Sequence, residues 1–69
     1  MDKIMVTREV LDGLEAVRTS GLTNMLDRLV VIELARRMGF DETACWIEDH
    51  RKEYAEGIFR GFEAEGGDG

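Results

Sequence analysis

The stretch LARRMGFDETACWI, residues 34–47, decides the fold because it predicts the end of one helix, a tight turn and the start of another. Gly39 can adopt positive φ just past a helix, and the apolar Phe40 can pack back on that helix. Asp41 is a favourable N-cap for the helix that follows. We therefore expect a helical hairpin at Gly39, in which two helices meet at a fixed angle.

A first helix is predicted at residues 8–20, with Thr7 as its N-cap. Its apolar positions follow the i, i+1, i+4, i+7 pattern of one helical face, and they are Val10, Leu11, Leu14 and Val17. Gly13 within it costs roughly 1 kcal/mol relative to alanine, so it either allows close approach of a neighbour or marks a weak point. The preceding Ile4-Met5-Val6 segment is short for a strand, and we expect it to cover the core.

A second helix is expected to begin after Thr23 as N-cap and to end before Gly39. Apolar residues cover most of its circumference, which predicts a central, buried helix. The β-branched run Val30-Val31-Ile32 would also suit a strand, but the total length of about fifteen residues favours a helix.

A third helix is predicted from Glu42 to about Phe62, with Asp41 as its N-cap. Its apolar arc is wider than one neighbour can cover, and two glycines one turn apart form a small-residue notch. We therefore predict an all-α, compact three-helix domain over residues 1–64 that forms a homodimer. The expected dimer interface is Gly57, Phe59 and Gly61, and residues 65–69 are expected to be a disordered acidic tail.

Length and composition limit the classes of protein that the chain can form. A chain of 69 residues with 43% hydrophobic content makes one small domain, too small for a large substrate cavity. The single cysteine excludes an internal disulfide, which is typical of a reducing compartment. No apolar run approaches the roughly 20 residues that span a bilayer, and the start lacks a signal-peptide core. We expect a soluble, cytoplasmic protein with no membrane partner.

Negative charge dominates the second half of the chain. The net charge is −6, and residues 41–69 carry all of it, with nine acidic residues against Arg51, Lys52 and Arg60. An acidic surface repels nucleic acid and favours basic partners. The expected partner-binding surface lies along one side of the third helix and comprises Glu48, Asp49, Glu53 and Glu56, with Trp46 beside it. An ordinary solvated face is the simpler interpretation of the same charges.

The residues capable of chemistry are few. His50 follows Asp49, but two such side chains on one helix are too few for a metal site, so a surface salt-bridging histidine is the simpler interpretation. No histidine or cationic residue is placed in the sequence to activate the Cys45 thiol. No phosphate-binding loop or nucleophile motif is present. We expect a protein that is not an enzyme and needs no cofactor and no metal.

Residues 33–49 resemble a DNA-binding helix-turn-helix, because Ala35 and Gly39 are spaced as the close crossing of two helices requires. The would-be recognition helix is acidic, whereas base edges and phosphates are read by Arg, Lys, Asn or Gln. A DNA-binding regulator is therefore kept as an alternative only, and nucleic acid is not the expected partner.

Three segments resemble a family of small phage and prophage proteins of gut and Gram-positive bacteria that is grouped as a domain of unknown function. They are Val6-Thr7-Arg8-Glu9-Val10, the turn Ser20-Gly21-Leu22-Thr23-Asn24-Met25, and Ile47-Glu48-Asp49-His50-Arg51-Lys52-Glu53-Tyr54. The resemblance implies an accessory protein made during infection or lysogeny. By analogy with small acidic phage inhibitors, we expect it to bind and inhibit a host protein with a basic surface, as a counter-defence (anti-CRISPR-like or other anti-defence) inhibitor. A virion or packaging accessory protein is a further alternative.

Overall fold

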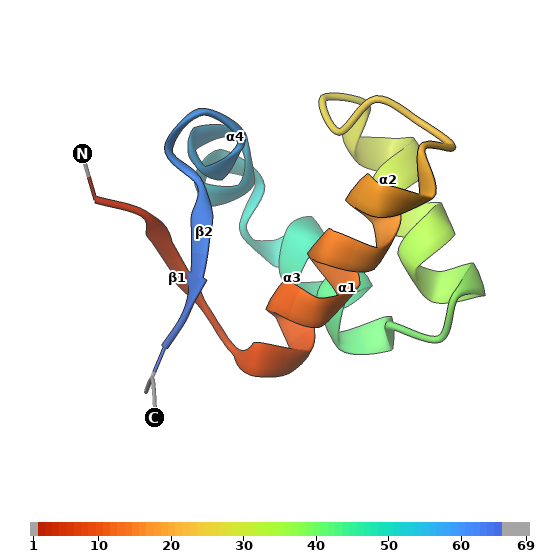
Figure 1. The fold of residues 1–69 in the computed structure, drawn as a ribbon, viewed down its shortest axis with the longest axis horizontal. Helices are drawn as coiled ribbons and strands as arrows, with labels where there is room; N and C mark the ends of the chain where they lie inside the picture. Colours follow the sequence, from red (N-terminus) through yellow and green to blue (C-terminus); the bar gives the residue numbers. More distant parts are fainter. Residues whose placement is uncertain (1, 66–69) are drawn as a thin grey trace.

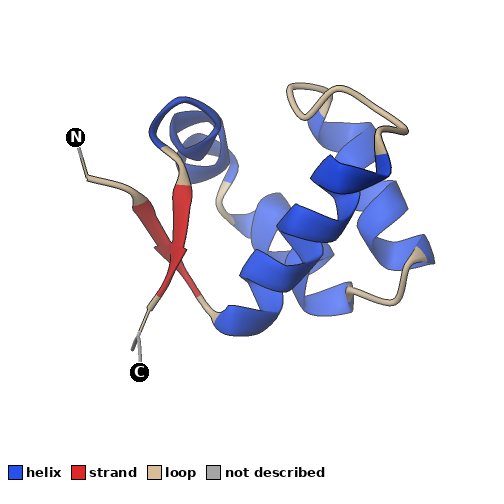
Figure 2. Cartoon of the chain, viewed as in Figure 1, coloured by secondary structure: helices blue, strands red, loops and turns tan. Residues whose placement is uncertain are grey.

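The computed structural model describes residues 2–65, and these form four helices and two short strands (Figures 1 and 2). In chain order they are β1 (Ile4–Val6), α1 (Arg8–Ser20), α2 (Arg28–Arg37), α3 (Asp41–Asp49), α4 (Arg51–Arg60) and β2 (Phe62–Ala64). The predicted helical class is confirmed. The predicted three-helix count is wrong, because the expected third helix is two helices.

Helix α1 has the bounds that the sequence predicted. The Thr7 side chain accepts a hydrogen bond from the backbone N–H of Val10, at 3.2 Å, and so caps the first turn. Gly21 ends the helix in the left-handed conformation, with φ of 69°.

Helix α2 begins later than predicted, because residues 22–27 form a loop. The Asn24 side chain accepts a hydrogen bond from the backbone N–H of Leu26, at 2.9 Å, and this local bond competes with helix formation. The helix buries Val31, Ile32 and Ala35 on one face, whereas Leu29 is 69% exposed. The prediction of a central, buried second helix is therefore wrong, and α3, which contacts α1, α2 and α4, lies at the centre.

The hairpin predicted at Gly39 joins α2 to α3. Gly39 has φ of 90°, and its N–H donates to the Arg36 carbonyl at 3.1 Å. The N–H of Phe40 donates to the Ala35 carbonyl at 2.8 Å, which completes a Schellman motif. Asp41 is the first residue of α3 and not its N-cap. Phe40 is at the N-cap position, and its side chain makes no capping hydrogen bond.

The break between α3 and α4 lies at His50, where φ is −125° and ψ is 54°. The backbone N–H of His50 donates to the Trp46 carbonyl at 2.8 Å. The ring Nδ1 lies 3.0 Å from the same oxygen and must donate, since a carbonyl can only accept. His50 therefore satisfies the end of α3 with both its backbone and its side chain.

Strands β1 and β2 pair in parallel at one edge of the molecule, with Ile4 opposite Phe62, Met5 opposite Glu63 and Val6 opposite Ala64 (Figure 1). The first segment, expected only to cover the core, is a strand because Phe62–Ala64 supplies its partner. Val6 also covers the core, at 1% exposure. Of the predicted tail, Glu65 donates its N–H to the Val6 carbonyl at 2.7 Å, and residues 66–69 lie outside the described residues.

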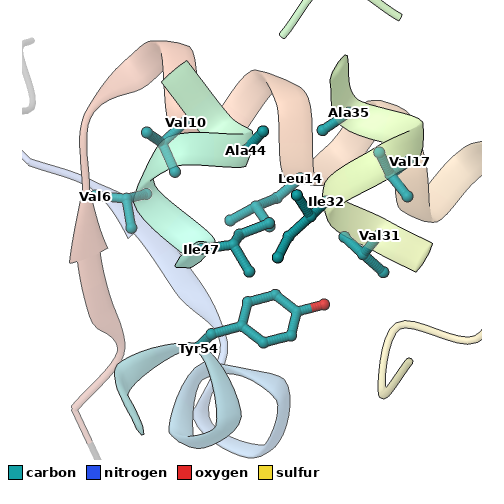
Figure 3. Close-up of a cluster of buried hydrophobic side chains, with 10 residues drawn as sticks. All are labelled: Val6, Val10, Leu14, Val17, Val31, Ile32, Ala35, Ala44, Ile47 and Tyr54. Carbon is teal, nitrogen blue, oxygen red and sulfur yellow. The ribbon is translucent and has the colours of Figure 1, made fainter. Parts of the chain in front are cut away.

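The core draws side chains from every helix and from β1 (Figure 3). It consists of Val6, Val10, Leu14, Val17, Val31, Ile32, Ala35, Ala44, Ile47 and Tyr54. Tyr54 points its hydroxyl out of this cluster toward the loop at residues 22–27, where it donates to the Met25 carbonyl at 2.5 Å. Burial raises the pKa of Tyr54 to about 12, against the opposing charge of Arg28.

Candidate functional site

The negative charge predicted for the second half of the chain is concentrated on α3. This helix carries four carboxylates and no Lys or Arg, and the four are Asp41, Glu42, Glu48 and Asp49. Helix α4 carries two acidic residues, Glu53 and Glu56, and three basic residues, Arg51, Lys52 and Arg60. The acidic surface of the molecule is therefore α3 and not the whole of the segment 41–60.

A shallow groove of about 450 Å³ runs along the exposed face of α3 toward the start of α1. Three of the α3 carboxylates line it, together with two aromatic rings and three other residues. The lining residues are Asp41, Glu42, Asp49, Trp46, His50, Thr7, Val10 and Cys45. We call this surface the α3 groove.

Trp46 forms a fixed, flat wall in the α3 groove. Its ring stacks on His50 with centroids 4.7 Å apart and planes 12° apart. Its ring also meets Phe62 edge to face, with centroids 6.0 Å apart. Because it contacts both of these rings, the half-buried indole has little rotamer freedom to lose when a partner binds.

Asp49 is the carboxylate of the α3 groove whose charge the helix dipole reinforces. It lies in the last turn of α3, where the negative end of the helix dipole adds to its charge. Asp41 and Glu42 lie in the first turn, where the dipole offsets theirs. Glu48 is paired with Arg36 at 3.0 Å, and this hydrogen bond raises the pKa of Arg36.

The predicted partner-binding residues divide into two groups in the structure. Trp46 and Asp49 lie together in the α3 groove. Glu48 points to Arg36, and the break at His50 places Glu53 and Glu56 on α4, so they do not continue the α3 face. Asp41 and Glu42 belong to the groove but were predicted only as an N-cap and a first-turn residue. The run of four acids without a base in residues 41–49 was the signal for them.

The predicted dimer residues lie at the end of α4. Gly57 is buried, and a Cβ added to it would lie 2.2 Å from the ring of Phe62. The predicted notch is thus filled by the chain's own side chain. Gly61 has φ of 96° and ends α4, and Phe59 is 82% exposed. The homodimer stays a prediction.

Two absences concern residues 2–65, the part of the chain that the structure describes. Within this part of the chain, no group of three or more His, Cys, Asp and Glu side chains is placed to hold a metal ion, and Cys45 is exposed and free. None of its helices combines the length and the apolar character needed to span a bilayer.

These features define a small helical protein with a short parallel strand pair and an acidic, aromatic groove. A family model for a domain of unknown function, DUF5049, matches residues 6–62, and the chain belongs to this family. The match runs from the end of β1 to the start of β2, so it includes all four helices. No curated protein and no solved structure matches the chain.

Proposed function

We propose that this protein is a non-enzymatic binding protein whose α3 groove receives a basic segment of another protein. The observation that carries the proposal is the placement of Asp41, Glu42 and Asp49 beside the flat face of Trp46 in one groove. A lysine or arginine of the partner would form charge-assisted hydrogen bonds with the carboxylates. The same cation would lie over the indole on the side away from the stacked His50, and indole is the best cation–π acceptor among the side chains.

The proposed biological role is inhibition of a host protein in the host cytoplasm, as a phage counter-defence inhibitor. Support for the phage setting comes from the resemblance of the three segments around Thr7, Gly21 and His50 to phage and prophage proteins. Support for inhibition comes from charge, because a carboxylate surface competes with nucleic acid for a basic groove. An inhibitor of this kind needs no cofactor and no catalytic group.

DNA binding is the second candidate, and one observation favours it. The Schellman turn at Gly39 and the buried Ala35 give α2 and α3 the close crossing of a helix-turn-helix. The exposed face of α3 is acidic, however, and would meet phosphates with like charge. Retention on heparin or DNA-cellulose at neutral pH and low salt would favour this candidate over the first.

The test is charge reversal in the α3 groove, with an arginine-rich peptide of about ten residues as the probe. The chain's one tryptophan lies in the groove, so its fluorescence reports binding there directly. For the Glu42→Lys, Asp49→Lys variant we expect association at low salt to slow by roughly tenfold or more, and by much less at high salt. Circular dichroism should match the parent, because exposed charges contribute little to stability.

The matched control reverses two exposed carboxylates outside the groove, in the Asp12→Lys, Glu63→Lys variant. It changes the net charge by the same amount, so it should slow association far less. Equal slowing in both variants would show that net charge alone attracts the peptide, and it would contradict the proposed groove. Capture from a host lysate with the parent, compared with the Glu42→Lys, Asp49→Lys variant, then identifies the natural partner.

A further inference from the structure

A second groove lies between α1 and α4, apart from the acidic α3 groove. Its walls are apolar and come from Leu11 and Leu14 of α1, Ile58 of α4, and Met25 and Phe62, with Gly57 among the lining residues. Its volume is about 210 Å³. At its rim, Arg18 and Glu15 form an ion pair that is half exposed to solvent. We call it the α1–α4 groove.

Phe59 is the most exposed large apolar side chain in the described residues, at 82%, and it is the neighbour of Ile58 in α4. Ala55, Ile58 and Phe59 are related by three- and four-residue steps, so they lie along one side of the helix. The small Ala55 is exposed and lets another helix approach this side. Helix α4 therefore carries an exposed phenyl ring at Phe59 and, at the neighbouring Ile58, part of the wall of an apolar groove.

We propose that two copies of the chain associate through α4, with Phe59 of each copy inserted into the α1–α4 groove of the other. An apolar cavity of roughly 150 Å³ holds a benzene molecule, so a groove of about 210 Å³ has room for the phenyl ring. A two-fold axis uses the same patch on both copies, and this patch contains both the inserted ring and its groove. Each groove is filled only when the partner is present.

Charge favours α4 over α3 as the place where two copies meet. Helix α4 has three bases against two acids, so two α4 helices meet without the repulsion that two copies of the acidic α3 would experience. Glu56 lies three residues before Phe59 and Arg60 follows it, and the groove rim carries the ion pair of Arg18 and Glu15. The inserted ring therefore brings a carboxylate and a guanidinium to a rim that carries one charge of each sign.

This arrangement differs from the dimer predicted from the sequence, in which Gly57 and Gly61 accept a partner's backbone. Phe62 of the same chain occupies the space above Gly57. Phe59 is retained from that prediction. The contacts added are with Leu11 and Leu14 of α1, which lie more than forty positions before Phe59 in the chain.

Sedimentation velocity over a range of micromolar concentrations tests the association. We expect the parent to be a dimer. For the Phe59→Ser variant we expect the dimer dissociation constant to rise by at least roughly 100-fold, because two phenyl rings per dimer lose their burial. The matched control is Leu29→Ser, which removes another exposed apolar side chain, 69% exposed on α2, and should leave the dimer intact. A monomeric parent, or a Phe59→Ser variant that remains dimeric, overturns the proposal.

Photocrosslinking tests where the ring goes. With benzoylphenylalanine at position 59 and a mixture of ¹⁴N- and ¹⁵N-labelled chains, the crosslinked peptides should join the two isotopes and contain Leu11 or Leu14. Crosslinks to α2, or only within one chain, would overturn the proposed groove. The arginine-rich peptide should still bind the α3 groove of the Phe59→Ser variant, so failure of the dimer and failure of the proposed function are separate results.

Discussion

At the scale of single residues, Gly13 and Thr43 hold α1 and α3 closer together than two ordinary side chains would allow. A Cβ added to Gly13 would lie 2.0 Å from Oγ1 of Thr43. Thr43 is fully buried, and its hydroxyl lies 3.2 Å from both the Glu9 and Val10 carbonyls of α1, to which it donates. Of the two roles open to Gly13 in the sequence, close approach of a neighbour is confirmed.

Gly13→Ala should therefore lower the free energy of unfolding by about 1–3 kcal/mol, the usual cost of overpacking a core. Helix propensity alone predicts the opposite, a gain of roughly 1 kcal/mol. Urea unfolding of the parent, both single variants and the Gly13→Ala, Thr43→Ala double variant measures the coupling between the two sites. Strictly additive losses would show that the two residues do not contact each other in solution.

At the scale of elements, the Tyr54 hydroxyl joins α4 to the loop between α1 and α2. The bond to the Met25 carbonyl is made by the neutral hydroxyl, and burial raises the pKa of Tyr54 to about 12, against about 10 in an unfolded chain. Between these two values the unfolded chain has lost the proton that the folded chain still holds. The ionisation of Tyr54 should thus leave the free energy of unfolding unchanged below about pH 10 and lower it as the pH rises toward 12.

Unfolding by urea at a series of pH values from 8 to about 12 checks this expectation, with Tyr54→Phe as the comparison. The phenylalanine variant should be less stable at pH 8 by about 1 kcal/mol, the net contribution of a typical hydrogen bond. Its further loss above pH 10 should be smaller than that of the parent, since the ring at position 54 no longer ionises. Parallel curves for the two proteins would contradict the assignment to Tyr54.

The elements that local signals specify were predictable, and those that depend on distant contacts were not. Thr7, Gly21 and Gly39 act on their own neighbours, so α1 and the α2–α3 turn followed from the sequence. The break in the long predicted helix lies at His50, whose ring bonds the Trp46 carbonyl and stacks on Trp46, and neither residue is a helix breaker by type. Charge pointed to the acidic face, but the separation of Glu53 and Glu56 from that face required the position of the break.

At the scale of the whole molecule, the two grooves are lined by different residues. The α3 groove lies on α3 and the start of α1, and the α1–α4 groove lies on the middle of α1 and the end of α4. They share no lining residue. A dimer formed through α4 would therefore leave both acidic grooves free, and one dimer would have room for two basic partners.

The pairing of β1 with β2 has a consequence for the order of folding. Ile4 and Phe62 are 58 positions apart, since 62 minus 4 is 58, so the strand pair closes almost the longest loop that the chain offers. Closing such a loop costs entropy that is recovered only after the helices between have packed. We expect the strand pair to form after the folding transition state, so Val6→Ala should speed unfolding in stopped-flow urea experiments and leave the refolding rate nearly unchanged. Refolding slowed in proportion to the lost stability would instead place the two ends of the chain in the folding nucleus.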